Sequence, residues 1–217
     1  HFFKETSNMM ANHFITDEVS EYPTDLHQFR DELEYRSMLV KKTRVIPFEC
    51  IVRGYITGSA WKEYKKTGMV NGIKQPENML ESQRFAEFVF TPSTKAEEGH
   101  DENISYEEML TRIDPYIAEE IKKKSIELYS YAHKLLNEKG IILADTKFEF
   151  GTINSDIYLI DEMLTPDSSR FWDKATYKIG DTPLSFDKQY IRDFTENSGW
   201  NKRPPAPELP DNVIKKT

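Results

Sequence analysis

Residues 143–151 constrain the fold more than any other stretch, because polar and apolar side chains alternate along them. Successive side chains of a strand point to opposite faces, so this run is typical of a strand with one face in a core. The core face would carry Ala144, Phe148 and Phe150. The other face would carry an acid, a base and an acid: Asp145, Lys147 and Glu149. Such a row suits a magnesium nucleotide, because carboxylates bind hard cations and an ammonium meets phosphate charge.

A returning strand is expected over residues 157–161, because the Asn-Ser-Asp sequence at 154–156 is typical of a turn. If the loop spans 154–156, Glu149 lies directly opposite Asp161, with Cβ atoms about 5 Å apart. Two carboxylates this close repel each other unless a cation or a proton lies between them, which indicates a metal site. A register shifted by one residue would remove the pairing. An exposed hairpin with a solvated charged face is the alternative.

A second candidate site lies in residues 53–61, where a strand is expected to end and a helix over 60–67 to begin. Ser59 would be the N-cap of this helix, and Gly58 would allow an unusual backbone conformation. Free amides at a helix N-terminus, a serine hydroxyl and the nearby Arg53 favour binding of a phosphate. The stretch is not a P-loop, because the GxxxxGK[ST] pattern is absent. A plain N-cap beside a surface arginine is the alternative.

Other segments show the periodicity of helices and strands. The clearest is a helix over 115–139, followed by Gly140 and preceded by a helix that opens with Ser105 as N-cap and Glu108 at N3. The remaining expected elements are a helix over 1–13, a strand over 14–19, an antiparallel strand pair over 38–45 and 47–54, a helix over 185–194 and an extended proline-rich stretch over 202–210. The polar loop 91–103 is interpreted as a lid or, alternatively, as a surface loop.

Charge and composition exclude several classes of protein. Lysine and arginine number 29 against 37 aspartates and glutamates, and the net charge of −8 argues against a general binder of nucleic acid or of anionic membranes. Cys50 is the one cysteine, which excludes an internal disulfide and favours a reducing compartment. The five histidines and this cysteine lack the spacing of a zinc site. No apolar run reaches the ~20 residues of a membrane span, so we expect a cytoplasmic protein.

Five motifs, in order, resemble one family. They are VRGYITGS (52–59), KAEEGHDE (95–102), DTKFEFG (145–151), DEMLTPDSSRFW (161–172) and SFDKQYIRDF (185–194). The similarity runs from about residue 36 to residue 210, and it is to the phosphoribosylaminoimidazole-succinocarboxamide (SAICAR) synthetases, in their long, yeast-type form. The resemblance implies a ligase of de novo purine biosynthesis, which joins L-aspartate to the carboxylate of carboxyaminoimidazole ribonucleotide (CAIR). ATP is the co-substrate and Mg²⁺ the cofactor, and the products are SAICAR, ADP and phosphate.

The same resemblance implies an α+β fold with two lobes, related to ATP-grasp and kinase-like enzymes, which clamp MgATP between them. We expect residues 1–52 to be the remainder of the N-terminal β-rich nucleotide-binding lobe and residues 53–217 to form the larger lobe. Family members begin with a glycine- and lysine-containing hairpin that covers the ATP phosphates. Nothing similar precedes His1, so the N-terminal lobe is expected to be incomplete in the residues given.

Matched onto the motifs of the family, the candidate residues fall into four groups. The magnesium-binding positions are Glu149 and Asp161. The catalytic positions are Asp145 and Lys147, together with Lys95 and Asp101 on a loop that closes over the substrates. The positions that hold the 5′-phosphate of CAIR are Arg53, Ser59 and Arg170. The nucleotide-binding positions are Glu49, Lys147 and Glu149.

The chemistry of amide formation agrees with this assignment. A carboxylate needs activation, most simply as an acyl phosphate, and phosphoryl transfer needs magnesium and cations more than a covalent nucleophile. Asp145 or Asp101 could accept the proton of the attacking amine, and the sequence does not choose between them. A small-molecule kinase with the same lobes and a non-catalytic acidic interaction domain are the alternatives. The expected partners are CAIR, L-aspartate and ATP, and the chain could be a monomer or a homo-oligomer.

Overall fold

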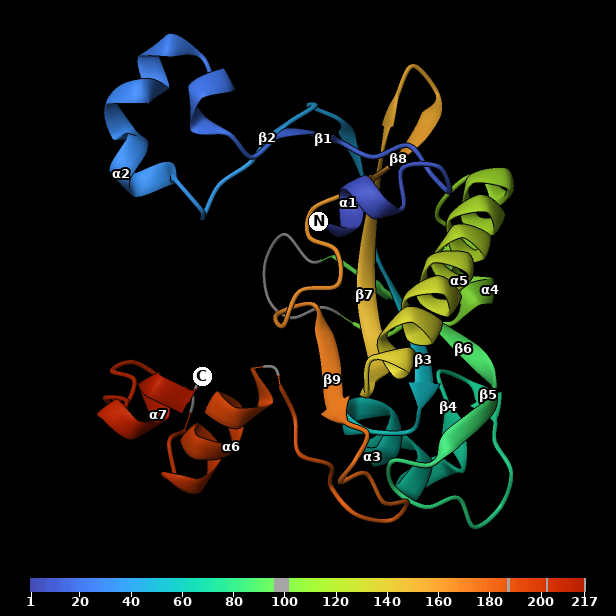
Figure 1. Ribbon diagram of the computed structural model, residues 1–217. Helices are drawn as coiled ribbons and strands as arrows, with labels where there is room; N and C mark the ends of the chain where they lie inside the picture. Colours follow the sequence, from blue (N-terminus) through green and yellow to red (C-terminus); the bar gives the residue numbers. More distant parts are fainter. Residues whose placement is uncertain (96–101, 187, 202, 217) are drawn as a thin grey trace.

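The computed structural model describes residues 1–95, 102–186, 188–201 and 203–216 (Figure 1). Its architecture is α+β, as predicted, with antiparallel sheets. The strands are β1 (Phe14–Thr16), β2 (Leu39–Val40), β3 (Arg44–Tyr55), β4 (Met69–Val70), β5 (Ile73–Lys74), β6 (Arg84–Thr94), β7 (Ile141–Ile153), β8 (Asp156–Ile160) and β9 (Ser169–Asp173). The helices are α1 (Phe2–Glu5), α2 (Arg30–Leu33), α3 (Gly58–Thr67), α4 (Tyr106–Leu110), α5 (Pro115–Glu138), α6 (Gln189–Asn197) and α7 (Asp211–Lys216), with 3₁₀ turns η1 (Val19–Glu21) and η2 (Thr24–Phe29).

The main sheet is antiparallel and has the order β6-β3-β7-β8, with β9 also paired to β7. β7 is its central strand, and one edge of β7 pairs with β3. The other edge is shared, because β9 pairs with residues 141–146 and β8 pairs with residues 149–153. Lys147 therefore lies where β8 and β9 part, and its backbone N–H donates to the carbonyl of Ser168 instead.

The helix α5 covers the opposite face of β3 and β7 (Figure 1). Its buried side chains lie on one face: Ala118, Ile121, Ser125, Leu128, Tyr129, Ala132 and Leu136. They pack against Phe148 and Phe150 of β7, which are fully buried, so the predicted core face of that strand is confirmed. The predicted cap at Ser105 is confirmed as well, since its hydroxyl accepts a hydrogen bond from the Glu108 backbone N–H at 3.0 Å.

The predicted strand pair over 38–45 and 47–54 is wrong. β3 is one continuous strand through Pro47, and its partners are β6 and β7 rather than the preceding segment. Pro47 lacks a backbone donor, and the register against β7 shifts between Val45 and Glu49 at this point. A bulge leaves a residue unpaired, so proline is tolerated there and the strand continues. The predicted boundary between residues 52 and 53 falls inside β3, and the division into two lobes stays a prediction.

Two predicted helices have other bounds. The helix over 1–13 is only α1, because the Asn12 side-chain amide donates to the carbonyl of Phe3 at 2.8 Å and turns the chain back. The helix over 185–194 begins later, at Gln189, because residue 185 forms a bridge to β9. The proline-rich stretch leads into α7, and the predicted strand over 14–19 is the shorter β1.

A half-buried histidine on α5 predicts a pH dependence of stability. Burial and the nearby charge of Arg84 lower the pKa of His133, whose Nε2 lies 3.4 Å from the Tyr55 hydroxyl. Below its ordinary pKa of about 6.5, the unfolded chain binds a proton that the folded chain resists, so stability falls as pH falls. The free energy of unfolding, measured in urea from pH 7.5 to pH 5, should fall less steeply in His133→Gln. The control His27→Gln, on η2, should keep the steeper slope, and equal slopes in both variants would contradict the prediction.

Candidate active site

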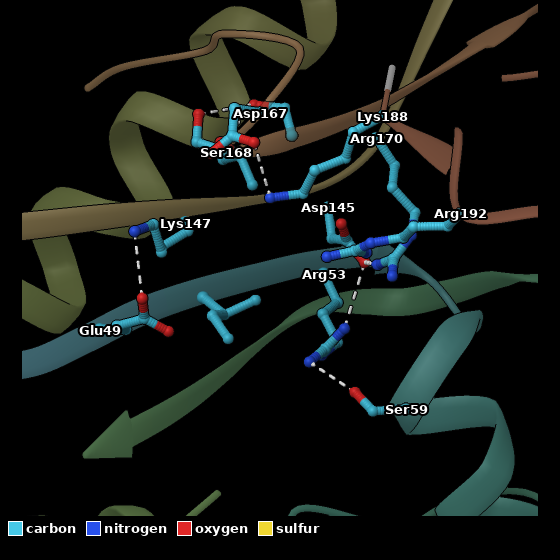
Figure 2. A pocket seen from close by; sticks show the side chains of 13 residues that line it. Glu49, Arg53, Ser59, Asp145, Lys147, Asp167, Ser168, Arg170, Lys188 and Arg192 are labelled. Atoms are coloured by element: carbon cyan, nitrogen blue, oxygen red, sulfur yellow. Dashed lines mark hydrogen bonds and ion pairs between the residues drawn. The ribbon is translucent and has the colours of Figure 1, made fainter. Parts of the chain in front are cut away.

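Asp145 and Lys147, two members of the polar row of β7, line a pocket of about 300 Å³ on the face of the sheet opposite α5 (Figure 2). Asp145, Lys147 and Glu149 share this face, as predicted, and they face Arg53, Ile51 and Glu49 across the ladder to β3. The far side of the pocket comes from residues 167–170 and from two cations near α6, Lys188 and Arg192. The pocket has two ends of different chemistry, one around Asp145 and the other around Lys147.

The anion end, as we name the surroundings of Asp145, consists of Asp145, Arg53, Arg170 and Ser59. One carboxylate oxygen of Asp145, Oδ2, accepts from Arg53 at 3.1 Å and from Arg170 at 2.5 Å. Arg53 is almost fully buried, and it also donates to the hydroxyls of Thr91 at 3.0 Å and Ser59 at 3.4 Å. The three residues predicted for phosphate binding, Arg53, Ser59 and Arg170, are thus brought together near Asp145. The sequence analysis had assigned Asp145 to catalysis instead.

Ser59 is not the N-cap that the sequence predicted. Helix α3 begins two residues earlier than predicted, at Gly58, and Thr57 is its N-cap residue without a side-chain cap bond. Ser59 therefore lies in the first turn, with its hydroxyl toward Arg53. Gly58 has φ +57°, and a Cβ there would lie 2.7 Å from Nη2 of Arg170. Glycine is needed at this position both for the backbone conformation and for the close approach of the guanidinium.

Replacing Gly58 by alanine should therefore cost stability in two ways. The positive φ alone costs an L-residue about 1–2 kcal/mol, and the displaced Arg170 side chain adds to that loss. Gly68 offers a matched control, since it has φ +70° with nothing within 4 Å of an added Cβ. Thermal unfolding should show a larger loss for Gly58→Ala than for Gly68→Ala. An equal loss would mean that Arg170 does not need this space.

The carboxylate end surrounds Lys147. Its Nζ lies 3.0 Å from Glu49, 2.9 Å from Glu149 and 3.6 Å from Asp161. Lys95 donates to the other oxygen of Glu149, which is nearly fully buried. Burial lowers the pKa of Lys147, but the hydrogen bonds and charges of Glu149 and Glu49 outweigh it and hold the pKa well above its ordinary value. The ammonium is therefore a permanent cation among three carboxylates.

The predicted pairing of Glu149 with Asp161 is wrong by one residue. The loop is Asn154 and Ser155 alone, both with positive φ, and Glu149 pairs with Ile160. A two-residue turn with positive φ at both positions has a twist that matches the twist of the flanking strands, which explains the shorter loop. Asp161 follows the end of β8 with φ +63°. The carboxylate directly across from Glu149 is Glu49 of β3, a pair that was not predicted and that lies across the other edge of β7.

The carboxylate end has the donors that Mg²⁺ prefers, because Glu49, Glu149 and Asp161 offer only oxygen. Within the described residues, however, no group of three or more acidic, histidine or cysteine side chains is arranged as a metal site. The ammonium of Lys147 lies between the carboxylates, and the Asp161 side chain is 42% exposed. The donor chemistry of these oxygens fits magnesium.

Two cations of the pocket were not predicted from the sequence. Lys188 and Arg192 line the pocket, and Figure 2 shows Lys188 bonded to Asp167, with Nζ and Oδ1 3.0 Å apart. Their four-residue spacing at the start of a helix was the available signal. Lys95, predicted as catalytic, reaches the site through Glu149. Asp101 lies outside the described residues.

Comparison with known proteins identifies the family. The model of the SAICAR synthetase family matches residues 1–207. Among curated relatives, the phosphoribosylaminoimidazole-succinocarboxamide synthase of Thermodesulfovibrio yellowstonii is 49% identical over 216 residues, covering 100% of this chain and 74% of that protein. The synthase of Elusimicrobium minutum is 52% identical over 214 residues, covering 98% of this chain and 73% of that protein.

Solved structures agree with the sequence comparison. The SAICAR synthase from Saccharomyces cerevisiae, solved in complex with SAICAR, superposes with a TM-score of 0.89 at 43% identity, over 99% of this chain and 73% of that one. A type-2 SAICAR synthetase in complex with ADP superposes with a TM-score of 0.66 at 26% identity, over 96% of this chain and 78% of that one. Fold and site thus define an enzyme of the SAICAR synthase fold with a charged pocket beside its central strand. The chain belongs to the SAICAR synthetase family.

Proposed function

We propose that this chain catalyses the ATP-dependent joining of L-aspartate to the carboxylate of CAIR, giving SAICAR, ADP and phosphate in de novo purine biosynthesis. Family membership supports the reaction, and relatives have been solved with SAICAR and with ADP. The observation in the structure that supports it best is the two-ended pocket. An anion end and a carboxylate end lie on one face of one strand, and their centres, Asp145 and Lys147, are about 7 Å apart at about 3.3 Å per residue.

The anion end is suited to the 5′-phosphate of CAIR. Arg53 and Arg170 meet at one oxygen of Asp145, and the Ser59 hydroxyl at the start of α3 lies within reach of Arg53. Guanidinium groups and the amides of a helix N-terminus are strong partners of phosphate oxygens. We assign Asp145 the task of holding the two guanidinium groups at a fixed separation before the phosphate arrives.

The carboxylate end is suited to the nucleotide phosphates with magnesium. Glu149 and Asp161 would hold the metal, Glu49 lies beside them, and Lys147 faces the transferring phosphoryl group. Magnesium, when bound, would neutralise negative charge on the phosphate oxygens. The pKa of Lys147 is held high, so its ammonium keeps its charge throughout turnover and attracts the moving phosphoryl oxygens.

The reaction needs a pocket that accepts several anions at once. The CAIR carboxylate attacks the terminal phosphorus of ATP, the bond from this phosphorus to the bridging oxygen breaks, and ADP leaves behind an acyl phosphate. The amine of L-aspartate then attacks the carbonyl carbon, phosphate leaves, and the amine proton passes to a base. Lys188 and Arg192 add two cations on the side of α6, which we assign to substrate carboxylates. Because Oδ2 of Asp145 is taken by two arginines, we favour Asp101 over Asp145 as the acceptor of the amine proton.

We propose that the enzyme acts in the cytoplasm. Within the described residues, no helix is long and apolar enough to cross a bilayer. Sequence charge argues against nucleic acid as a partner.

Release of ADP distinguishes the ligase from a kinase of the same fold. With ATP and Mg²⁺ present, ADP release by the protein should require both CAIR and L-aspartate, and SAICAR should form in equal amount. A chelator in excess of Mg²⁺ should stop both. Steady ADP release with CAIR alone would contradict the ligase and favour the phosphotransferase.

A further inference from the structure

Tyr129 of α5 is a fully buried side chain whose hydroxyl meets the backbone of both central strands. It donates to the carbonyl of Leu143 at 2.6 Å, and the carbonyl of Ala144 lies at 3.2 Å. On β3, the backbone of Gly54 lies against the same phenol oxygen, which leaves no room for a side chain at that position. A single phenol therefore links β7 and β3 from the helix side of the sheet.

The contacted residues lie where the strand pairing is irregular. The register between β7 and β9 shifts between Leu143 and Asp145, and the register between β3 and β6 shifts between Arg53 and Tyr55. A bulge disrupts the regular ladder of hydrogen bonds. At this point the Tyr129 hydroxyl gives the carbonyls of Leu143 and Ala144 a side-chain donor. Each irregular residue also adjoins a member of the anion end. Ala144 precedes Asp145, and Gly54 follows Arg53.

The ring of Tyr129 is held in place by close packing. The Phe88 ring of β6 meets it edge-on with centroids 4.7 Å apart, and the His133 ring stacks on it at 5.8 Å. A Cβ on Gly54 would lie 2.3 Å from the phenol oxygen, so glycine is required there by space. Burial, followed by the charge of Asp145, raises the pKa of Tyr129 well above its ordinary value, which keeps the hydroxyl a donor.

We propose that Tyr129 is a positioning residue for substrate binding at the anion end. Its hydroxyl fixes the backbone that carries Asp145 and Arg53, and so it sets where the guanidinium groups meet the substrate phosphate. The inference rests on the proposed function, because that function assigns the 5′-phosphate of CAIR to these arginines. The carboxylate end lies farther along β7, where residues 49–53 of β3 pair with residues 145–149 without a shift, and none of its members adjoins a carbonyl that this hydroxyl contacts.

The test is Tyr129→Phe, which removes only the hydroxyl, assayed in the full protein below its unfolding midpoint. We expect KM for CAIR to rise about tenfold, the effect of losing one hydrogen bond that orders the backbone beneath the anion end. We expect kcat and KM for ATP to change less than about twofold. Two matched controls remove a buried hydroxyl elsewhere. Tyr55→Phe acts in the same aromatic cluster, and Ser125→Ala removes a hydroxyl that bonds within α5 at 2.6 Å; both should keep the parental KM for CAIR.

Two further variants separate the possible outcomes. Gly54→Ala should push the phenol away and raise KM for CAIR without the loss of any side-chain atom, and Arg170→Ala should raise it through direct contact. Parental KM values in Tyr129→Phe and Gly54→Ala, with a raised KM in Arg170→Ala, would overturn the positioning role and leave the proposed function standing. A parental KM in Arg170→Ala would overturn the phosphate assignment itself, and the inference with it.

Discussion

Replacing Asp145 by alanine is expected to lower the free energy of unfolding by about 3–5 kcal/mol, among the largest losses available to a single substitution in this chain. Its carboxylate is the acceptor for two guanidinium groups, and the side chains of Arg53 and Asp145 are only 5% and 7% exposed. Removing the acid leaves a buried cation without its counter-charge. Such a charge cannot recover the hydration that it lost on folding.

Urea unfolding at neutral pH measures this loss. The matched control is Asp156→Ala, an exposed acid at the start of β8, which should change stability by less than about 0.5 kcal/mol. Asp145→Asn keeps the shape and removes the charge, so it should lose nearly as much as the alanine variant. A loss no larger than that of the control would show that Arg53 does not need the acid, and the proposed task of Asp145 would then be wrong.

Replacing Glu149 by glutamine is expected to lower turnover by about 10²- to 10³-fold, the range found when one preorganised polar group is removed from an active site. The side chain is nearly fully buried between Lys95 and Lys147, and glutamine preserves its volume but removes the charge. If Glu149 holds magnesium, the variant should also need a higher Mg²⁺ concentration for half-maximal rate, because a neutral amide is a weaker ligand than a carboxylate.

Steady-state rates across a Mg²⁺ titration test this expectation. Glu127→Gln is a suitable control, since that acid pairs with Lys124 on the outer side of α5 and should leave rate and Mg²⁺ dependence unchanged. If Glu149→Gln lost turnover while its Mg²⁺ dependence stayed parental, Glu149 would act through Lys147 rather than through the metal. If both turnover and Mg²⁺ dependence stayed parental, Glu149 would have no role in the active site.

Local sequence patterns predicted those parts of the fold that depend on periodicity. The alternation over 143–151 placed Phe148 in the core and Glu149 on the open face, because a strand has only two faces. The helical spacing over 115–139 and the cap at Ser105 predicted α5 and the start of α4. The five ordered motifs led to the family, which the comparisons confirm.

Features that depend on one residue of register or on distant neighbours were not predictable in this way. The hairpin register depends on two residues with positive φ, Asn154 and Ser155, and the sequence allows loops of either length. Pro47 was predicted to separate two strands, but β3 continues through it with a bulge in its pairing with β7. The missed cations, Lys188 and Arg192, belong to a segment that reaches the pocket only through tertiary packing.

The sequence by itself determined which side chains share a face of β7, since the alternation of a strand depends on neighbouring residues alone. It also determined the helix that covers the other face and the family to which the chain belongs. Only the tertiary structure decided which charges meet, because the partners of Asp145 and Lys147 come from β3, β9 and the loop before β9. Interaction between charges depends on distance in space, and burial strengthens it further, so neither partner nor strength can be read along the chain.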